Sequence, residues 1–225
     1  MKSDKIITID GPAGSGKSTL ALNLAQAFGW VCLDTGALYR AVALVALERG
    51  LTPSDRQEAA ELARTLDLRL YVEEGKTLVV AGDREVSSLI RTPEISNFAS
   101  LFSALPEVRE ALVDAQRNLG SRGEVVAEGR DMGTVIFPWA ALKFFLTAEA
   151  KVRAYRRHLQ LAREGIVAEL EKLEEDILIR DHNDSSRETA QLKPAPDAFI
   201  IDGTNLSAFE VETIMIGEAK RVFGL

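Results

Sequence analysis

The chain has 225 residues, of which 46% are hydrophobic, and a formal net charge of −7 at pH 7. This length suits one compact domain with insertions or two small domains, and the apolar content is sufficient for a sizeable core. The acidic balance argues against broad binding to nucleic acid or to acidic membranes, because such binding requires a basic face. We therefore expect neither a nucleic-acid polymer nor a membrane as partner, and any basic function to be local.

The cysteine and histidine content excludes two kinds of structural site. Cys32 is the only cysteine and lies in an apolar run, so it cannot form an internal disulfide. One cysteine and two histidines cannot build the usual structural zinc sites. The N-terminal apolar run is short and lacks a small-residue cleavage site, and nowhere do 18 apolar residues follow one another. We therefore expect a cytoplasmic protein.

Residues 11–19 read GPAGSGKST and match the phosphate-binding pattern GxxxxGK[ST]. An apolar run precedes them and a helical pattern follows, which is the context that the motif requires. Glycines let backbone N–H groups curl around phosphate oxygens, Lys17 reaches the β and γ phosphates, and the Ser18 hydroxyl can bind Mg²⁺. The sequence therefore predicts a site for ATP or GTP, formed by Gly11, Pro12, Ala13, Gly14, Ser15, Gly16, Lys17, Ser18 and Thr19.

Short β-branched runs alternate with helical periodicity along the chain, at residues 5–9, 30–33, 124–127, 143–146 and 198–201. This alternation predicts an α/β fold in which a five-stranded parallel sheet is flanked by helices. Ligands of such sheets gather at the carboxyl ends of the strands. Here those ends carry Asp10, Asp34, Glu128, Thr147 and Asp202.

The connection between the second and third predicted strands, residues 34–122, is far longer than a crossover requires. Inside it, the runs 68–72 and 77–80, joined by a turn at 73–76, predict a hairpin, and residues 82–83 predict a further turn. Helical patterns at 54–66 and 93–103 flank the hairpin. We expect a subdomain at 35–105, inserted into a core formed by residues 1–34 and 106–225.

The predicted helix at 148–163 is unusually basic and carries Lys151, Arg153, Arg156, Arg157 and Arg163. Such a segment is usually a solvated charged face. Beside a phosphate loop, however, we favour a mobile lid at about 150–167 that carries arginines to the nucleotide. Gly165 either provides a hinge for this lid or simply ends the helix.

Three polar segments follow predicted elements: DTGALYR at 34–40, GRDMGT at 129–134, and RDHNDSSR at 180–187. Each arginine taken singly could belong to a surface ion pair or a helix end. Together they are an excess of arginines in an acidic protein, and the guanidinium fork matches phosphate in a bidentate way. The sequence therefore predicts a second anion site beside the phosphate loop.

These segments resemble the bacterial type of cytidylate kinase, a family of P-loop nucleoside monophosphate kinases, over essentially the whole chain. The resemblance implies a P-loop NTPase core with an inserted NMP-binding subdomain, a small antiparallel sheet and a short helical lid. It also implies Mg²⁺-dependent transfer of the γ-phosphoryl group of ATP to CMP or dCMP, which gives CDP or dCDP and ADP. The sequence departs from the family pattern at Glu128, where the family often has aspartate, and at Thr35, where it has serine.

The same resemblance implies roles for individual acceptor-site residues. Ser100, Arg109 and Asp131 would contact the cytosine edge, where Asp131 can accept a hydrogen bond from the exocyclic amine that uracil lacks. Asp184, helped by Arg180, would hold the sugar hydroxyls.

The residues implied for the phosphates are mostly cationic. Arg40, Arg130 and Arg187, with Thr35 nearby, would hold the acceptor phosphate. The charge that develops during transfer would be neutralised by Lys17, Arg130, Arg180 and Arg187. The resemblance places Arg153, Arg156 and Arg157 in the lid, and Arg157 is our candidate for the ATP contact.

Two other functions remain open from the residues alone. A kinase for another nucleoside monophosphate or for a hydroxyl-bearing metabolite shares the phosphate loop, although a hydroxyl acceptor asks for a carboxylate base and fewer arginines. A GTP-dependent switch would need a guanine-reading Asn-Lys-x-Asp segment, which the sequence lacks. Because the predicted site is complete within one chain, we expect a monomer whose partners are CMP, dCMP and ATP.

Overall fold

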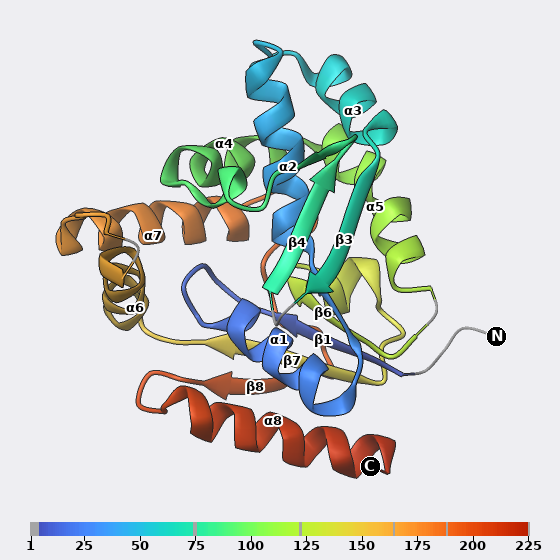
Figure 1. Cartoon of the computed structure of the whole chain (residues 1–225). Coiled ribbons are helices and arrows are strands. Elements are labelled where there is room, and N and C mark those ends of the chain that lie inside the picture. The colour runs from blue at the N-terminus through green and yellow to red at the C-terminus, as the bar shows by residue number, and fades with distance from the viewer. Residues whose placement is uncertain (1–4, 74–75, 122, 164, 188, 225) are drawn as a thin grey trace.

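The computed structural model describes residues 5–73, 76–121, 123–163, 165–187 and 189–224. Its centre is a parallel sheet of five strands in the order β2-β6-β1-β7-β8 (Figure 1). The strands are β1 (Ile6–Asp10), β2 (Val31–Asp34), β6 (Val125–Gly129), β7 (Leu142–Thr147) and β8 (Phe199–Asp202). The predicted α/β class and all five predicted strands are therefore confirmed.

Helices cover both faces of this sheet, which explains why its strands read as continuous apolar runs. On one face, α1 (Lys17–Phe28) and α8 (Ala208–Phe223) pack against Ile7, Ile9 and Phe144. On the other face, α5 (Pro106–Leu119) and the short π-helical turn η2 (Met132–Ile136) contribute side chains to a cluster with Ile6 and Leu33. The layers leave the carboxyl ends of the strands open to the rest of the chain.

The segment between β2 and β6 folds around a second, antiparallel sheet, as predicted. It contains α2 (Thr35–Glu48), α3 (Arg56–Thr65), β3 (Leu68–Glu73), β4 (Lys76–Ala81), β5 (Arg84–Glu85), the 3-10 turn η1 (Leu89–Arg91) and α4 (Pro93–Ser103). Of the predicted hairpin turn, residues 74 and 75 lie outside the described residues, and Glu73 pairs with Lys76. The predicted turn at 82–83 leads into a third strand, β5, which the sequence pattern did not reveal.

Helix α5 shares its apolar core with this inserted segment. Its residues Val108 and Leu112 pack in one cluster with Phe102 of α4 and Leu62 of α3. The division of the chain at residue 105 therefore stays a prediction, because the apolar packing continues across it.

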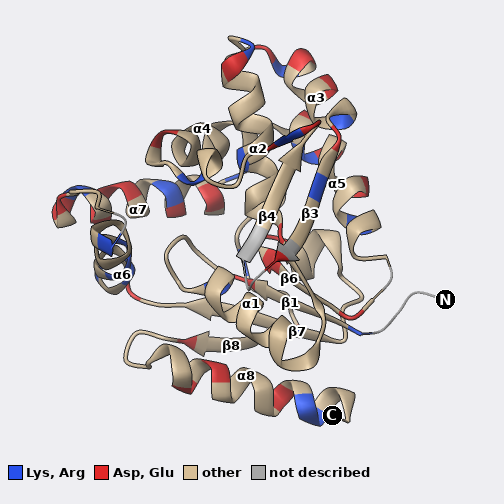
Figure 2. Cartoon of the chain, viewed as in Figure 1, with Lys and Arg blue, Asp and Glu red and all other residues tan. Residues whose placement is uncertain are grey.

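Helices α6 (Ala150–Arg163) and α7 (Leu170–Ser185) pack on each other beside the phosphate loop (Figure 1). Beyond α6, the Gly165 N–H donates to the Ala162 carbonyl (3.1 Å) and the Ile166 N–H donates to the Leu161 carbonyl (2.9 Å). Gly165 has a φ of 75°, so it supports the interpretation that this glycine ends the helix. Helix α6 carries lysine and arginine but no acidic residue, whereas α7 carries side chains of both charges (Figure 2). No helix in the described part of the chain combines the length and the apolar character needed to cross a bilayer.

Candidate active site

The phosphate loop connects β1 to α1 and leaves the start of α1 open. Gly16, the residue before the helix, has a φ of 100° and, as a glycine, has no side chain to cap the first N–H groups of the helix. The first N–H groups of α1 therefore point to the loop, where an anion can accept from them. A Cβ on Gly11 would lie 2.0 Å from the Leu146 carbonyl oxygen of β7, so only glycine fits the entrance to the loop.

Lys17 lies inside the loop, with a residue exposure of 5%. Its ammonium group donates to the Pro12 carbonyl (2.8 Å) and lies 3.4 Å from the Ser15 hydroxyl. Burial and then the charge of Arg130 lower the pKa of Lys17 to about 7, against the opposing effect of Glu128. Phosphate oxygens at this position would compete with the Pro12 carbonyl for the ammonium group and favour its charged form.

Ser18 and Glu128 bring together two side-chain oxygens that could hold Mg²⁺. The Ser18 hydroxyl donates to Glu128 Oε1 at 2.7 Å. Glu128 is the sheet neighbour of Asp34, and burial followed by the charge of Asp34 raises its pKa to about 7. Mg²⁺ is usually held by one or two carboxylates together with substrate phosphates, rather than by an all-protein cage. Glu128 stands where the family often has aspartate, and its longer side chain reaches the hydroxyl of Ser18.

Thr35 and Arg40 lie close to this pair of carboxylates. The Thr35 hydroxyl donates to the Glu128 carbonyl at 2.8 Å, so it links α2 to β6. Asp34 accepts from the Ala37 N–H (2.9 Å) at the start of α2 and forms an ion pair with Arg40 (3.2 Å). Although burial raises the pKa of Asp34, Arg40 and these hydrogen bonds hold it below its usual value.

Arg109 and Asp131, both predicted to contact the base, form a buried ion pair. The guanidinium of Arg109 also donates to the Ser103 carbonyl (3.1 Å) and lies 5.3 Å from the centre of the Tyr39 ring. A cavity of about 340 Å³ borders the pair, with Val113 and Ala190 in its wall. The structure places Ser100 one helical turn before Ser103, not in the lining of this cavity.

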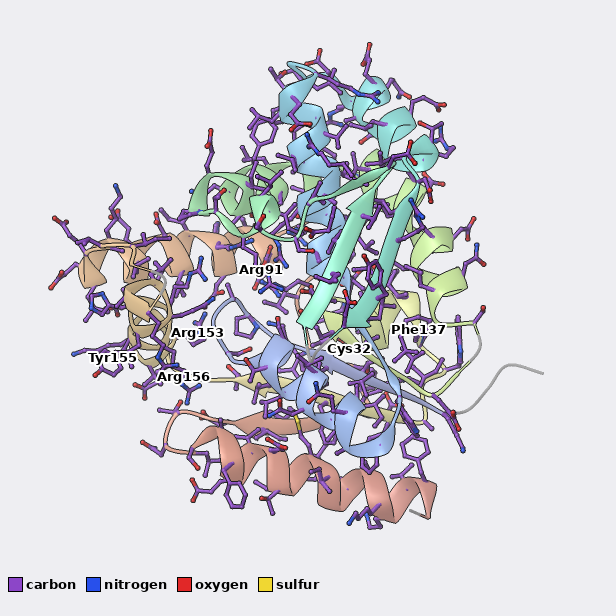
Figure 3. The ribbon with its side chains drawn as sticks, in the orientation of Figure 1. Cys32, Arg91, Phe137, Arg153, Tyr155 and Arg156 are labelled. Carbon is purple, nitrogen blue, oxygen red and sulfur yellow. The ribbon has the colours of Figure 1, made fainter. Side chains whose placement is uncertain are left out.

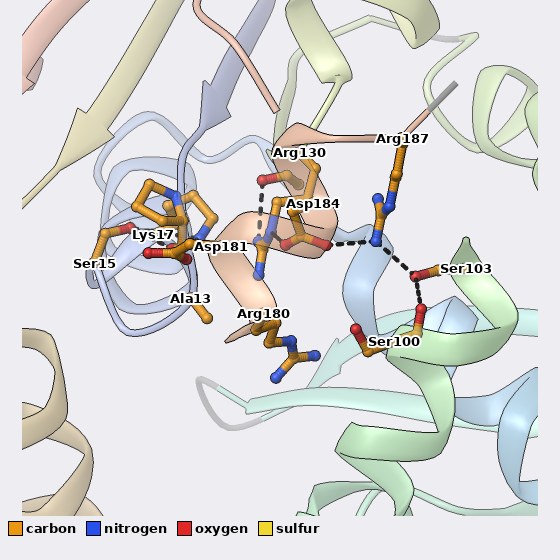
Figure 4. A network of polar contacts seen from close by, with 12 residues as sticks. Ala13, Ser15, Lys17, Ser100, Ser103, Arg130, Arg180, Asp181, Asp184 and Arg187 are labelled. Atoms are coloured by element: carbon orange, nitrogen blue, oxygen red, sulfur yellow. Dashed lines mark hydrogen bonds and ion pairs between the residues drawn. The ribbon is translucent and has the colours of Figure 1, made fainter. Parts of the chain in front are cut away.

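Asp184 joins two of the predicted arginines (Figure 4). Its carboxylate is 2% exposed and accepts from Arg130 Nε (2.7 Å) and from Arg187 Nη2 (2.5 Å). Burial raises the pKa of Asp184, but Arg130 and Arg187 together hold it below the usual value. The carboxylate therefore stays ionised and draws the two guanidinium groups together.

Arg180 lies one turn earlier on α7 and donates to the Ser96 carbonyl at 3.2 Å. Burial and the repulsion of Arg130 lower its pKa to about 10, with further repulsion from Arg40 and Arg187. The main charges that act on Arg180 come from three arginines, Arg40, Arg130 and Arg187, and from one carboxylate, Asp184, so cations outnumber carboxylates here. The predicted arginines of α2, α7 and the loop after β6 therefore meet in one cluster.

The comparisons with known proteins show the family of the chain. The family model described as cytidylate kinase matches residues 7–221. This chain belongs to the cytidylate kinase family. It is 46% identical over 216 residues to the cytidylate kinase of Saccharophagus degradans, with 96% of each chain covered. It is 47% identical over 205 residues to that of Exiguobacterium sibiricum, which covers 91% of this chain and 92% of the relative.

A likeness to solved structures supports the fold alone. A gluconokinase from Sinorhizobium meliloti 1021 matches with a TM-score of 0.50 and 16% sequence identity, over 98% of this chain and 94% of that chain. Because the identity is low, it supports the P-loop kinase fold of the cytidylate kinase family and no particular acceptor.

The structure brings a different lid arginine to the phosphate loop of this cytidylate kinase family member than the one we selected. Arg153 donates to the Ala13 carbonyl (2.9 Å) and to Asp181 (2.6 Å), whereas Arg157 donates to Gln160 of its own helix (2.9 Å). Arg153 and Arg156 both point from α6 towards the core, while Tyr155 points outwards (Figure 3). The sequence offered one signal for this shared direction: Arg153 and Arg156 are three residues apart, which places them on one face of a helix.

Asp10 is a residue of the site to which the sequence analysis assigned no role. Its carboxylate, at the end of β1, accepts from the N–H groups of Met132 (2.8 Å) and Gly133 (2.7 Å). Burial raises the pKa of Asp10 to about 6, against these two hydrogen bonds. Asp10 therefore connects the phosphate loop to the loop that carries Asp131. Its place at the carboxyl end of a strand was the only signal in the sequence.

Proposed function

We propose that this chain transfers the γ-phosphoryl group of ATP to CMP or dCMP, with Mg²⁺, and forms CDP or dCDP and ADP. One observation carries the acceptor site in particular. The Nε groups of Arg40 and Arg187 are buried and have no hydrogen-bond partner among the described residues. Buried donors without a partner are costly, and an acceptor phosphate would satisfy both of them.

The acceptor needs no general base, because a phosphate oxygen is already ionised at neutral pH. The obstacle is the repulsion between two anions, so catalysis consists of alignment and charge neutralisation. We assign the acceptor phosphate to Arg40, Arg130 and Arg187, and the charge of the transferred group to Lys17 and Arg180. A cluster in which cations outnumber carboxylates supports this assignment.

On the donor side, the phosphate loop would bind the ATP phosphates through backbone N–H groups and Lys17. Ser18 and Glu128 would hold Mg²⁺, which supplies neutralisation of the β and γ phosphates. We add Arg153 to this group, because it already donates to the Ala13 carbonyl of the loop. An ATP contact of Arg157 stays a prediction.

On the base side, we assign the exocyclic amine of cytosine to Asp131 and a neighbouring ring acceptor to Arg109. Asp184, with Arg180, would hold the sugar hydroxyls, while Ser100 and Thr35 stay predicted contacts. The buried Arg109–Asp131 pair supports this assignment, because buried polar groups discriminate strongly between bases that do and do not match them. The monomeric state and the cytoplasmic location also stay predictions.

The test is a coupled ADP-release assay with Mg²⁺ and ATP, in which CMP, dCMP, UMP, AMP and shikimate are offered in parallel. We expect fast turnover with CMP and dCMP alone. Asp131→Asn should lower kcat/KM for CMP at least about tenfold. It should also reduce the ratio of kcat/KM for CMP to that for UMP, since the amide can donate to the uracil carbonyl. Asp114→Asn, an exposed change on α5, is the control. Turnover with shikimate but not CMP would favour a hydroxyl acceptor.

A further inference from the structure

Ser103 is the last residue of α4 and lies between the arginines of the base site and those of the phosphate site. It is 8% exposed. Its hydroxyl accepts from Arg187 Nη2 (3.0 Å) and donates to the Ser100 carbonyl (3.1 Å), as Figure 4 shows. Its own carbonyl accepts from Arg109 Nη1 (3.1 Å). One residue thus contacts both groups of arginines.

These contacts complete a continuous polar network across the acceptor site. Arg109 pairs with Asp131 on one side of Ser103, and Arg187 pairs with Asp184 on the other. The bond between Ser103 and Arg187 also joins two segments that are 84 residues apart in the sequence. It therefore connects α4 of the inserted segment to the loop that follows α7.

The direction of the Ser103 hydroxyl is determined by its neighbours. A hydroxyl has one proton, and here that proton is donated to the Ser100 carbonyl. A lone pair therefore faces the guanidinium of Arg187, which can only donate. With Ser103 and Asp184 both bound at Nη2, the plane of the guanidinium is restrained, and its buried Nε group keeps no partner in the described structure.

We propose that Ser103 is a positioning residue for the acceptor phosphate: its hydroxyl restrains Arg187 so that the Nε group is held ready for that phosphate. This inference rests on the proposed function and deepens it. It assigns the two halves of Ser103 to different tasks, because the hydroxyl acts on the phosphate side through Arg187 whereas the carbonyl acts on the base side through Arg109.

The division of tasks makes the test specific. Ser103→Ala removes the hydroxyl and keeps the carbonyl, so KM for CMP should rise about tenfold, which corresponds to about 1.4 kcal/mol. KM for ATP should stay within about twofold. The KM values for CMP, dCMP and UMP should all rise by the same factor, since the Ser103 carbonyl still accepts from Arg109. Ser103→Thr, which keeps the hydroxyl, should restore most of the affinity for CMP.

The chain offers a matched control for this variant. Ser121 lies just beyond the end of α5, and like Ser103 it donates to the carbonyl three residues earlier, that of Asn118 (2.7 Å), but it is exposed. Ser121→Ala should change neither KM. If Ser103→Ala melts below the assay temperature, Ser103→Cys, which offers only a weak acceptor, is measured under the same expectations.

An unchanged KM for CMP, an equal rise in the KM for ATP, or a changed ratio of CMP to UMP would each overturn the role of Ser103. Failure of the unaltered protein to phosphorylate any pyrimidine monophosphate would instead overturn the proposed function. The two failures are therefore distinguishable in one set of assays.

Discussion

Replacement of Asp184 by asparagine tests whether the arginine cluster is an anion site held together by one carboxylate. Asp184 is almost fully buried and pairs with Arg130 (2.7 Å) and Arg187 (2.5 Å). Removal of one partner from a buried ion pair typically costs about 3–5 kcal/mol, because a charge is left uncompensated. For a chain of this size, about 4 kcal/mol corresponds to a fall in Tm of roughly 8–16 °C.

Urea and thermal unfolding of Asp184→Asn measure this loss directly. The control is Glu218→Gln, because Glu218 and Arg221 form an ion pair with the same three-residue spacing (2.6 Å). That pair is exposed, with side-chain exposures of 25% and 71%, so its removal should cost less than about 0.5 kcal/mol. Both variants lose an ion pair with the same sequence spacing, one buried and one exposed, and Asp184→Asn also loses the pair with Arg130.

Inorganic phosphate separates an anion site from a structural ion pair. With the carboxylate gone, the cluster carries more positive charge, so phosphate should raise the Tm of Asp184→Asn by more than that of the unaltered protein. A loss of stability no larger than that of Glu218→Gln would refute the reasoning. So would an equal effect of phosphate on both proteins.

Three further predictions concern the donor half of the site. The pKa of Asp10 is raised from 3.8 to about 6 in the fold, so its contribution to stability is present below pH 4 and is lost as the pH rises through 6. The free energy of unfolding, relative to that of Asp10→Asn, should therefore fall by about 2 kcal/mol between pH 4 and pH 7. Urea unfolding measures this free energy, and a rise with pH would contradict the prediction. Gly11→Ala places a Cβ 2.0 Å from a carbonyl and should abolish ATP binding in calorimetry, whereas Gly217→Ala, in an open helical position, should stabilise by about 0.5–1 kcal/mol. Arg153→Ala should raise KM for ATP at least about fivefold and leave KM for CMP unchanged; an equal result for the exposed control Lys151→Ala would remove Arg153 from the site.

The amino-acid sequence by itself determined those features that depend on neighbouring residues. The phosphate loop, the five parallel strands and the hairpin of β3 and β4 were all predicted, because each rests on a local motif or on the period of apolar side chains. The short strand β5 was missed, since its two residues are too few to show a period. The arginines that we assign to the acceptor site could be predicted as a group from their positions after strands and at the end of a helix.

Only the tertiary structure decided which side chain meets which. Arg153 and Arg157 have the same charge and lie on the same helix, and the packing of α6 brings the first of them to the phosphate loop. Asp10 and Ser103 likewise gain their partners from segments more than 80 residues away. A local pattern carries no signal for such contacts, because they depend on how the inserted segment, α7 and the sheet pack against one another.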